Sequence, residues 1–237
     1  MRVGGSLALV LAAIVLIACE PVRHPPPGQQ LAALKRDEGQ TRVLVMPMEV
    51  ELFELTAGGV PVPKAEWTSG ARTLLSAELR QAMQTHNVAA VDYDDTAVTP
   101  ERRDHFTQLI KLHNLVGGSM RIEQYRPDVI PPTRKSQGPW TLGPEVRDLK
   151  DQYGASYALF THVSDSYSST GRVIAQILAA GVGIGLHGGV QVGFASLVDL
   201  DTGDLVWFNA LGRATGDVRN ADGARETVAA LLTDFPK

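Results

Sequence analysis

Residues 191–209 read Gln-Val-Gly-Phe-Ala-Ser-Leu-Val-Asp-Leu-Asp-Thr-Gly-Asp-Leu-Val-Trp-Phe-Asn, and this stretch decides the fold. Its first half alternates with a period of two, and a second β-rich run at 205–208 follows the turn residues 201–204. Gly203 can adopt the positive φ that a short turn between strands requires, and the neighbouring Asp side chains can bond the turn amides. We therefore expect an antiparallel β-hairpin. The residues on one face of its first strand are Val192, Phe194, Ser196, Val198 and Leu200.

The N-terminus has the pattern of an export signal. Arg2 precedes an apolar run from Leu7 to Ala18, and the run ends at Cys19, the only cysteine of the chain. The run is shorter than the roughly 20 residues that a transmembrane helix requires. Residues 16–19, Leu-Ile-Ala-Cys, resemble the lipobox of bacterial lipoproteins, in which the signal is cut before the cysteine and the thiol carries the lipid. The alternatives are an ordinary signal peptide and a short membrane anchor.

These features divide the chain into three parts. We expect a lipoprotein signal peptide at 1–18, a lipidated Cys19 with a Pro-rich tether at 19–40, and a single α/β periplasmic domain at 41–237. A single cysteine excludes an internal disulfide, so the domain depends on its core. The 22 basic residues less Arg2 leave 21 against 26 acidic ones in the mature chain. This acidic balance lacks the basic stripe of a nucleic-acid partner, so we expect none.

Hydrophobic periodicity predicts the order of the elements in the domain. Thr99-Pro100 is typical of a helix start, and Gly117-Gly118 is expected to stop that helix. Pro47 indicates an edge or a bend in the first strand. The expected elements are a strand at 42–49, a helix at 64–86, a strand at 88–93, a helix at 99–117, a strand at 118–125, an irregular loop at 127–142, a short helix at 144–154, a central strand at 155–164, the hairpin, and a final helix at 221–232.

The predicted fold class is α/β, with a mixed sheet of about five strands, helices packed on it, and an antiparallel β-hairpin and a C-terminal helix at the end. This order resembles the α/β domain of the group of envelope lipoproteins that includes CsgG, LpoB and the amino-terminal domain of TolB. Two local patterns carry the resemblance, at 153–160 (Tyr-Gly-Ala-Ser-Tyr-Ala-Leu-Phe) and at 197–207 (Leu-Val-Asp-Leu-Asp-Thr-Gly-Asp-Leu-Val-Trp).

The resemblance implies a lipid-anchored envelope protein that works by binding or assembly, because the group shares no catalytic residues. It implies a membrane contact through the lipid anchor and either a protein partner or self-assembly. Glu20, and not Asp, follows Cys19. In many Gram-negative bacteria Asp at this position is associated with retention in the inner membrane, so we expect the periplasmic face of the outer membrane.

Residues 171–189 form the most unusual segment, because no charged residue occurs between Val173 and Leu186. Residues 183–188 match Gly-x-Gly-x-x-Gly, but a strand follows where a dinucleotide site needs a helix, so we predict no cofactor. The segment is either a glycine-faced helix on a partner or lipid surface, or a buried connector with tight turns. The loop at 127–140 is a second candidate surface. The candidate interaction residues are Val173, Ile174, Ile177, Leu178, Gly181, Gly183, Gly185 and Trp140.

Other polar residues give weaker patterns. His105 and His113 are eight residues apart, not the four that place two metal ligands on one helical face. Asp92, Asp94 and Asp95 lack the glycine and the final glutamate of a calcium loop, and are interpreted as a solvated strand end. The sequence therefore predicts no metal site.

Three functional hypotheses follow from these patterns. The first is a non-enzymatic, lipid-anchored binding or assembly module, and the second is a subunit of a secretion channel like CsgG. The third is an envelope hydrolase that uses His162 and Asp165 near Ser164, Ser166 and Ser168, although no Gly-x-Ser-x-Gly motif supports it.

Overall fold

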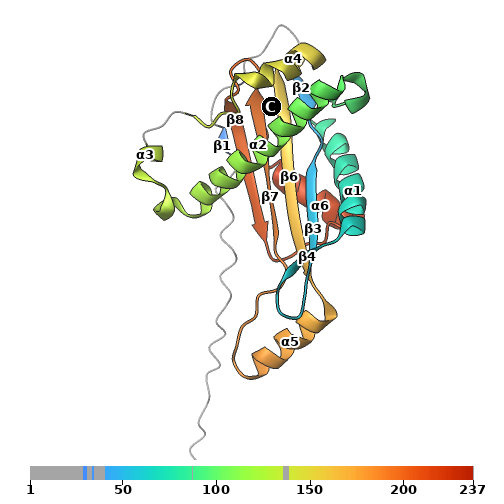
Figure 1. The fold of residues 1–237 in the computed structure, drawn as a ribbon, viewed down its shortest axis with the longest axis vertical. Coiled ribbons are helices and arrows are strands. Elements are labelled where there is room, and N and C mark those ends of the chain that lie inside the picture. The colour runs from blue at the N-terminus through green and yellow to red at the C-terminus, as the bar shows by residue number, and fades with distance from the viewer. Residues whose placement is uncertain (1–28, 31–33, 35–40, 87, 136–138, 237) are drawn as a thin grey trace, which may run out of the picture.

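The computed structural model describes residues 29–30, 34, 41–86, 88–135 and 139–236, and over this part of the chain eight strands form one mixed sheet (Figure 1). The strands are β1 Gln29–Gln30, β2 Arg42–Val45, β3 Glu49–Leu55, β4 Pro61–Pro63, β5 Ala89–Asp92, β6 Tyr157–Ser168, β7 Gln191–Asp199 and β8 Leu205–Arg213. Their main order is β1-β8-β7-β6-β2-β5, with β3 beside β6 and β4 beside β3. The predicted fold class is confirmed, and several of the additional strands are short.

Helices cover both faces of the sheet (Figure 1). One face packs on α1 and α6, and the other on α2 and α4, so each face has its own hydrophobic core. The helices are α1 Ala65–Met83, α2 Pro100–Tyr125, α3 Pro132–Lys135, α4 Arg147–Tyr153, α5 Thr170–Gly181 and α6 Ala221–Leu231, and the 3-10 turns are η1 Asp95–Ala97, η2 Pro127–Val129 and η3 Pro144–Val146.

The predicted hairpin is confirmed and consists of β7 and β8. Its turn has the glycine conformation and the Asp hydrogen bonds that the sequence predicts. Gly203 has a φ of 83°, in the region that favours glycine. The Asp199 carboxylate accepts hydrogen bonds from the backbone N–H groups of Asp201 at 2.8 Å and Thr202 at 3.3 Å. The expected central strand is β6, which pairs in parallel with β2 and β3 and antiparallel with β7.

The expectation of a helix end at Gly117-Gly118, followed by a strand at 118–125, is wrong. Helix α2 continues to Tyr125, with Phe106, His113 and Met120 among the buried residues of one face. A Cβ atom on Gly117 would overlap the ring of Phe194 in β7, so this glycine allows the helix to approach the sheet closely. The contacts made by the buried face outweigh the helix penalty of about 1 kcal/mol for each glycine.

The strand predicted at 42–49 is divided at Pro47. Val45 pairs with Leu159 of β6, whereas Glu49 pairs with His162, so the first strand contains one residue more than its partner over this interval. An extra residue of this kind bends a strand, as in a β-bulge, and proline cannot donate a ladder hydrogen bond. The bend separates β2, which pairs with β5 and β6, from β3, which pairs with β4 and β6.

Candidate functional site

Helix α5 and the segment that follows it project from one end of the sheet (Figure 1). We call residues 170–190 the arm. The side chain of Ser169 caps the helix by accepting a hydrogen bond from the Arg172 N–H at 3.2 Å, and none of the residues of α5 is buried. The β3–β4 turn lies at the same end of the sheet and contacts the arm, because Arg172 Nη1 donates to the Ala57 carbonyl oxygen at 3.4 Å.

The apolar face of α5 points away from the protein. Ile174, Ile177 and Leu178 are 53, 66 and 69% exposed, and they lie one turn apart on the helix surface. The polar side chains face inward, where Arg172 Nη2 donates to the His187 carbonyl oxygen at 2.8 Å and Gln176 Nε2 donates to Leu186 O at 3.3 Å. An amphipathic surface helix normally turns its apolar face to its own core, so the orientation of α5 is inverted.

Other exposed apolar residues surround this face. They come from α5 itself, from residues 182–190 that follow it in the arm, and from the β3–β4 hairpin, and they extend the apolar surface at this end of the molecule. These additional exposed residues are Val60, Val62, Val173, Val182, Ile184 and Val190.

The interpretation of 171–189 as a buried connector is wrong, because the predicted interaction residues of the arm lie at the surface. The three glycines do not form a packing face within the protein, since a Cβ atom on Gly181, Gly183 or Gly185 would meet nothing within 4 Å. Gly183 has a φ of 78° and follows the end of α5. The motif at 183–188 precedes β7 and no helix, as the order of elements predicts.

Trp140, the remaining predicted interaction residue, lies at the opposite end of the sheet from the arm. Its indole Nε1 donates to Glu123 Oε2 at 3.1 Å, and its carbonyl oxygen accepts from Leu205 N at 2.9 Å, beside the hairpin turn. The half-buried ring packs against the core on the α2 face. The structure therefore does not bring Trp140 and the arm together.

The catalytic pairing of His162 and Asp165 is contradicted by their geometry. Both residues belong to β6, but His162 stacks on Phe194 on the α2 face, with the ring centres 4.9 Å apart. Asp165 lies on the opposite face, where its Oδ2 accepts from Tyr167 Oη and from Gln191 Nε2, each at 2.7 Å. Side chains an odd number of positions apart in a strand point to opposite faces, so the two groups cannot exchange a proton directly.

Asp165 instead belongs to a polar network at the base of the arm. Gln191, its partner at the start of β7, also accepts at Oε1 from Arg213 Nε of β8 at 2.6 Å. Burial raises the pKa of the Asp165 carboxyl above its ordinary value, against the hydrogen bonds that favour the charged form. The network joins β6, which leads into the arm, to β7 and β8, which follow the arm in the chain. It thereby holds the base of α5 in place.

The other polar candidates have structural partners. His113 is buried and its Nε2 lies 2.9 Å from Ser196 Oγ, whereas His105 pairs with Asp148 at 3.5 Å. Asp94 caps η1 by accepting from Thr96 N at 2.9 Å. Among the described residues, no group of three or more His, Cys, Asp and Glu side chains is arranged to hold a metal ion.

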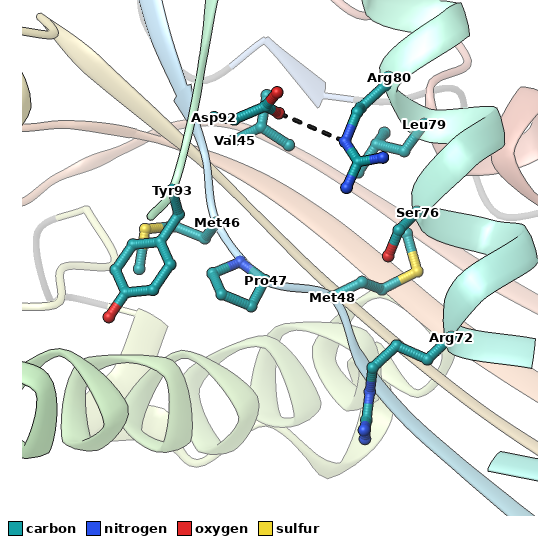
Figure 2. A pocket seen from close by; sticks show the side chains of 10 residues that line it. All are labelled: Val45, Met46, Pro47, Met48, Arg72, Ser76, Leu79, Arg80, Asp92 and Tyr93. Atoms are coloured by element: carbon teal, nitrogen blue, oxygen red, sulfur yellow. Dashed lines mark ion pairs between the residues drawn. The ribbon is translucent and has the colours of Figure 1, made fainter. Parts of the chain in front are cut away.

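A cleft that the sequence analysis did not identify lies where β2 and β5 end (Figure 2). It has a volume of about 260 Å³ and lies beside α1. Arg80 and Asp92 face each other there, with Arg80 Nε 3.6 Å from Asp92 Oδ1. The lining residues are Val45, Met46, Pro47, Met48, Arg72, Ser76, Leu79, Arg80, Asp92 and Tyr93. Only the spacing of Arg72, Ser76 and Arg80, four residues apart on one helical face, could have indicated it from the sequence.

No helix within the described part of the chain is long and apolar enough to cross a membrane. Cys19 and the expected signal peptide lie outside the described residues. Of the expected tether at 19–40, Gln29 and Gln30 pair with β8, and Leu34 packs against the core on the α1 face.

No family model matches the chain, and no curated protein is similar to it at a significant level. Among solved structures, the chain is similar to the PelC dodecamer from Paraburkholderia phytofirmans, with 12% identity over 86% of this chain and 93% of that one and a TM-score of 0.38. It is also similar to lipoprotein GNA1162 from Neisseria meningitidis (13% identity, 81% and 93% covered, TM-score 0.33). A third likeness is the LpoB C-terminal domain from Salmonella enterica (14% identity, 74% and 84% covered, TM-score 0.27).

Proposed function

We propose that this protein is a lipid-anchored lipoprotein of the cell envelope that acts by binding and not by catalysis, and that its arm docks on the membrane that holds the lipid of Cys19. The observation that carries the proposal is the inverted orientation of α5. An apolar helix face that is turned to water indicates an external apolar surface that covers it. A lipid surface accepts such a face without a specific partner, since an amphipathic helix can lie in the interface with its apolar side buried.

The charge distribution of the arm supports a lipid surface. Between Val173 and Leu186 the chain carries no charged side chain, and Arg172 lies at the base of the helix with its guanidinium turned to backbone carbonyls. Transfer of Ile174, Ile177 and Leu178 into the interface would contribute on the order of 1 kcal/mol for each side chain, after allowance for their partial exposure. A contact of this strength supplements a lipid anchor and does not replace it.

The direction of β1 supports the proposal that the arm and the lipid on Cys19 contact the same membrane. Gln29 pairs with Phe208 and Gln30 with Trp207 in antiparallel orientation, so the chain enters β1 from the side of Arg213, where the arm is attached. The distance from Phe208 to Arg213 along β8 is about 17 Å. The ten peptide steps from Cys19 to Gln29 span at most about 36 Å. This stretch can therefore extend up to about 19 Å past the end of β8, on the side where the arm is attached.

Flotation with liposomes tests this proposal. A form of the protein that begins at residue 20, and therefore has no lipid, is mixed with vesicles of phosphatidylethanolamine and phosphatidylglycerol. Because the arm alone binds weakly, we expect only a fraction of the unmodified protein to cofloat at millimolar lipid, and the double variant Ile177→Gln and Leu178→Gln to lose at least about 80% of that bound fraction. The matched control is Leu115→Gln and Ile122→Gln on α2, where the side chains are 72 and 51% exposed.

Self-assembly is the competing outcome of the same experiment. If the arm instead contacts a second copy, the unmodified protein will form an oligomer in light scattering without vesicles, and the Ile177→Gln and Leu178→Gln variant will be monomeric. A ring seen by microscopy of the lipidated protein would favour the channel hypothesis. Equal flotation of the unmodified protein and the arm variant would contradict the membrane proposal.

A further inference from the structure

Helix α2 lies across one face of the sheet (Figure 1), and its outer side carries a second row of apolar side chains. Leu112, Leu115 and Ile122 are 38, 72 and 51% exposed. The buried residues of the helix lie on its other side and belong to the core on the α2 face. Single exposed apolar residues are common, but three of them within about three turns of one helical face form a patch that a partner normally covers.

The spacing of this row favours a second helix as its cover. Residues 112, 115, 119 and 122 follow the three-four-three spacing with which two helices pack side by side at a crossing angle of about 20°. All four residues are exposed, and Ser119 has a small side chain that another helix can approach closely. The row has the width of the seam of a helix pair, which is narrower than the apolar face with which a helix covers a core.

The charged residues at the two ends of the row have opposite signs. Glu101 and Asp104 lie at the start of α2, and Arg126 directly follows its last residue. All three are exposed, and their positions continue the row at steps of three or four residues. Arg126 forms an ion pair with Asp128, but both side chains are 62% exposed, so this pair contributes little and the guanidinium stays accessible. Along α2 the row is therefore acidic, then apolar, then basic.

The two arginines between Glu101 and Asp104 do not cancel the acidic end of the row. Arg102 Nη1 donates to Gln152 Oε1 at 2.6 Å, and Arg103 Nη2 donates to the Asp95 carbonyl oxygen at 2.7 Å. Their guanidinium groups are therefore held by α4 and η1 of the same chain.

We infer that this row binds the same row of a second copy in antiparallel orientation, so that the protein forms a twofold-symmetric dimer through α2. In a pair centred on Leu115, Asp104 and Arg126 are each eleven residues from the centre, so Asp104 of each copy faces Arg126 of the other. Gln108 and Ile122 are each seven residues from the centre and face each other in the same way. A row that is complementary to its own reverse fits a twofold contact, whereas a parallel pair would place like charges side by side.

The contact is expected to be weak in solution. One helix from each copy is expected to bury less than the roughly 1,200–2,000 Å² of stable interfaces, so we expect a Kd on the order of 10–100 µM. Two copies that share one membrane have a higher effective concentration, which favours the dimer at lower protein levels. This last step depends on the proposed lipid anchor, but the contact itself does not.

Sedimentation equilibrium tests the inference. The form that begins at residue 20 is used, because it contains every residue that the structure describes. We expect a monomer–dimer equilibrium between about 1 and 200 µM, both for the unmodified protein and for the arm variant Ile177→Gln and Leu178→Gln. Addition of Leu115→Gln and Ile122→Gln to the arm variant should raise the Kd at least about tenfold, because each copy loses apolar contacts. The arm variant is the matched control, since it replaces two exposed apolar side chains elsewhere.

Cysteine crosslinking tests the orientation of the pair. The form that begins at residue 20 has no cysteine of its own, because Cys19 is the only one in the chain. Gln108→Cys and Ile122→Cys proteins are mixed, with an affinity tag on one of them, and oxidised. An antiparallel pair joins the two different proteins by a disulfide, whereas a parallel pair joins like to like. We expect the mixed product to predominate.

A thermal unfolding curve of each variant verifies the fold. The inference is overturned if the arm variant stays monomeric at about 200 µM, if the substitutions on α2 leave the Kd unchanged, or if the crosslinks join only like proteins. Loss of the dimer in the arm variant alone would assign the association to the arm and would also overturn the inference. Flotation at about 1 µM protein, below the expected Kd, compares monomers, so failure of the dimer leaves the membrane proposal intact.

Discussion

His113 is a histidine that the fold keeps neutral. It lies in α2 with 1% of its surface exposed, and its ring stacks on Phe160 at 5.0 Å between centres. Burial, together with the nearby His162, lowers the pKa of His113 to about 3. In the sequence this residue is notable only for its distance from His105, and the structure adds Ser196, a partner 83 residues away that no local pattern could identify.

The shifted pKa of His113 predicts a pH dependence of stability. In the unfolded chain the imidazole binds a proton below about pH 6.5, whereas in the folded protein it remains neutral down to about pH 3. The unfolded state therefore binds more protons in this window, and the free energy of unfolding falls with decreasing pH by up to about 1.4 kcal/mol per pH unit from this group. We expect urea unfolding of His113→Gln to show a shallower slope between pH 6.5 and 4.5. An unchanged slope would show that His113 becomes protonated in the folded state.

At the level of the element, α2 owes its length to contacts with the sheet. Gly117 and Gly118 are neighbours on this helix with opposite surroundings, because a Cβ atom on Gly117 would overlap Phe194, whereas one on Gly118 would meet nothing within 4 Å. As glycines, the two residues have the same low helix propensity, so local sequence predicts that the helix ends at both of them. The difference arises from the distance to β7, which the local sequence does not contain.

This pair gives a matched test of the helix packing. We expect Gly117→Ala to destabilise the protein by about 1–3 kcal/mol, because the added methyl group forces Phe194 or the helix to move. Gly118→Ala should instead stabilise it by about 0.5–1 kcal/mol, because alanine has the higher helix propensity. Urea denaturation of both variants measures the two free energies. Destabilisation by both substitutions to the same extent would contradict the close approach of α2 to β7.

Elements with a strong local pattern could be predicted from the sequence. The hairpin depends on Gly203 and its neighbouring Asp residues, and α1 and α6 follow from apolar residues at helical spacing. The short strand β4, Pro61–Pro63, was not predicted because two of its three residues are prolines, and it forms only as a partner of β3. The position of β3 depends on the register between Glu49 and His162, which is a tertiary property.

The arm could be predicted from the sequence, whereas the cleft beside α1 could not. The arm was identified from the sequence, because a long uncharged stretch is visible in the residues themselves, but the direction of its apolar face was not. The cleft was missed because it depends on the bend at Pro47 and on the end of β5 beside α1. Its residues come from segments centred near 47, 76 and 92, and only the fold brings them together.

At the scale of the whole molecule, the sheet separates two ends with different surfaces. The arm and the β3–β4 turn lie at one end, and the hairpin turn with Trp140 lies at the other (Figure 1). Strand β7, with its nine residues, separates them by about 30 Å. If the arm lies on the membrane, the end with Trp140 faces away from it and is available to other envelope components.

The most direct test of the arm and its membrane is fluorescence quenching by lipids brominated in their acyl chains. In the full-length protein the thiol of Cys19 is expected to be occupied by lipid, so a single engineered cysteine can be labelled selectively. Labels are placed by Ile177→Cys on the arm and by Leu115→Cys on α2, both of which replace exposed side chains. We predict strong quenching of the label at 177 and little at 115 in vesicles that hold the anchored protein. Equal and weak quenching at both positions would mean that the lipid alone holds the protein and that the arm contacts something else.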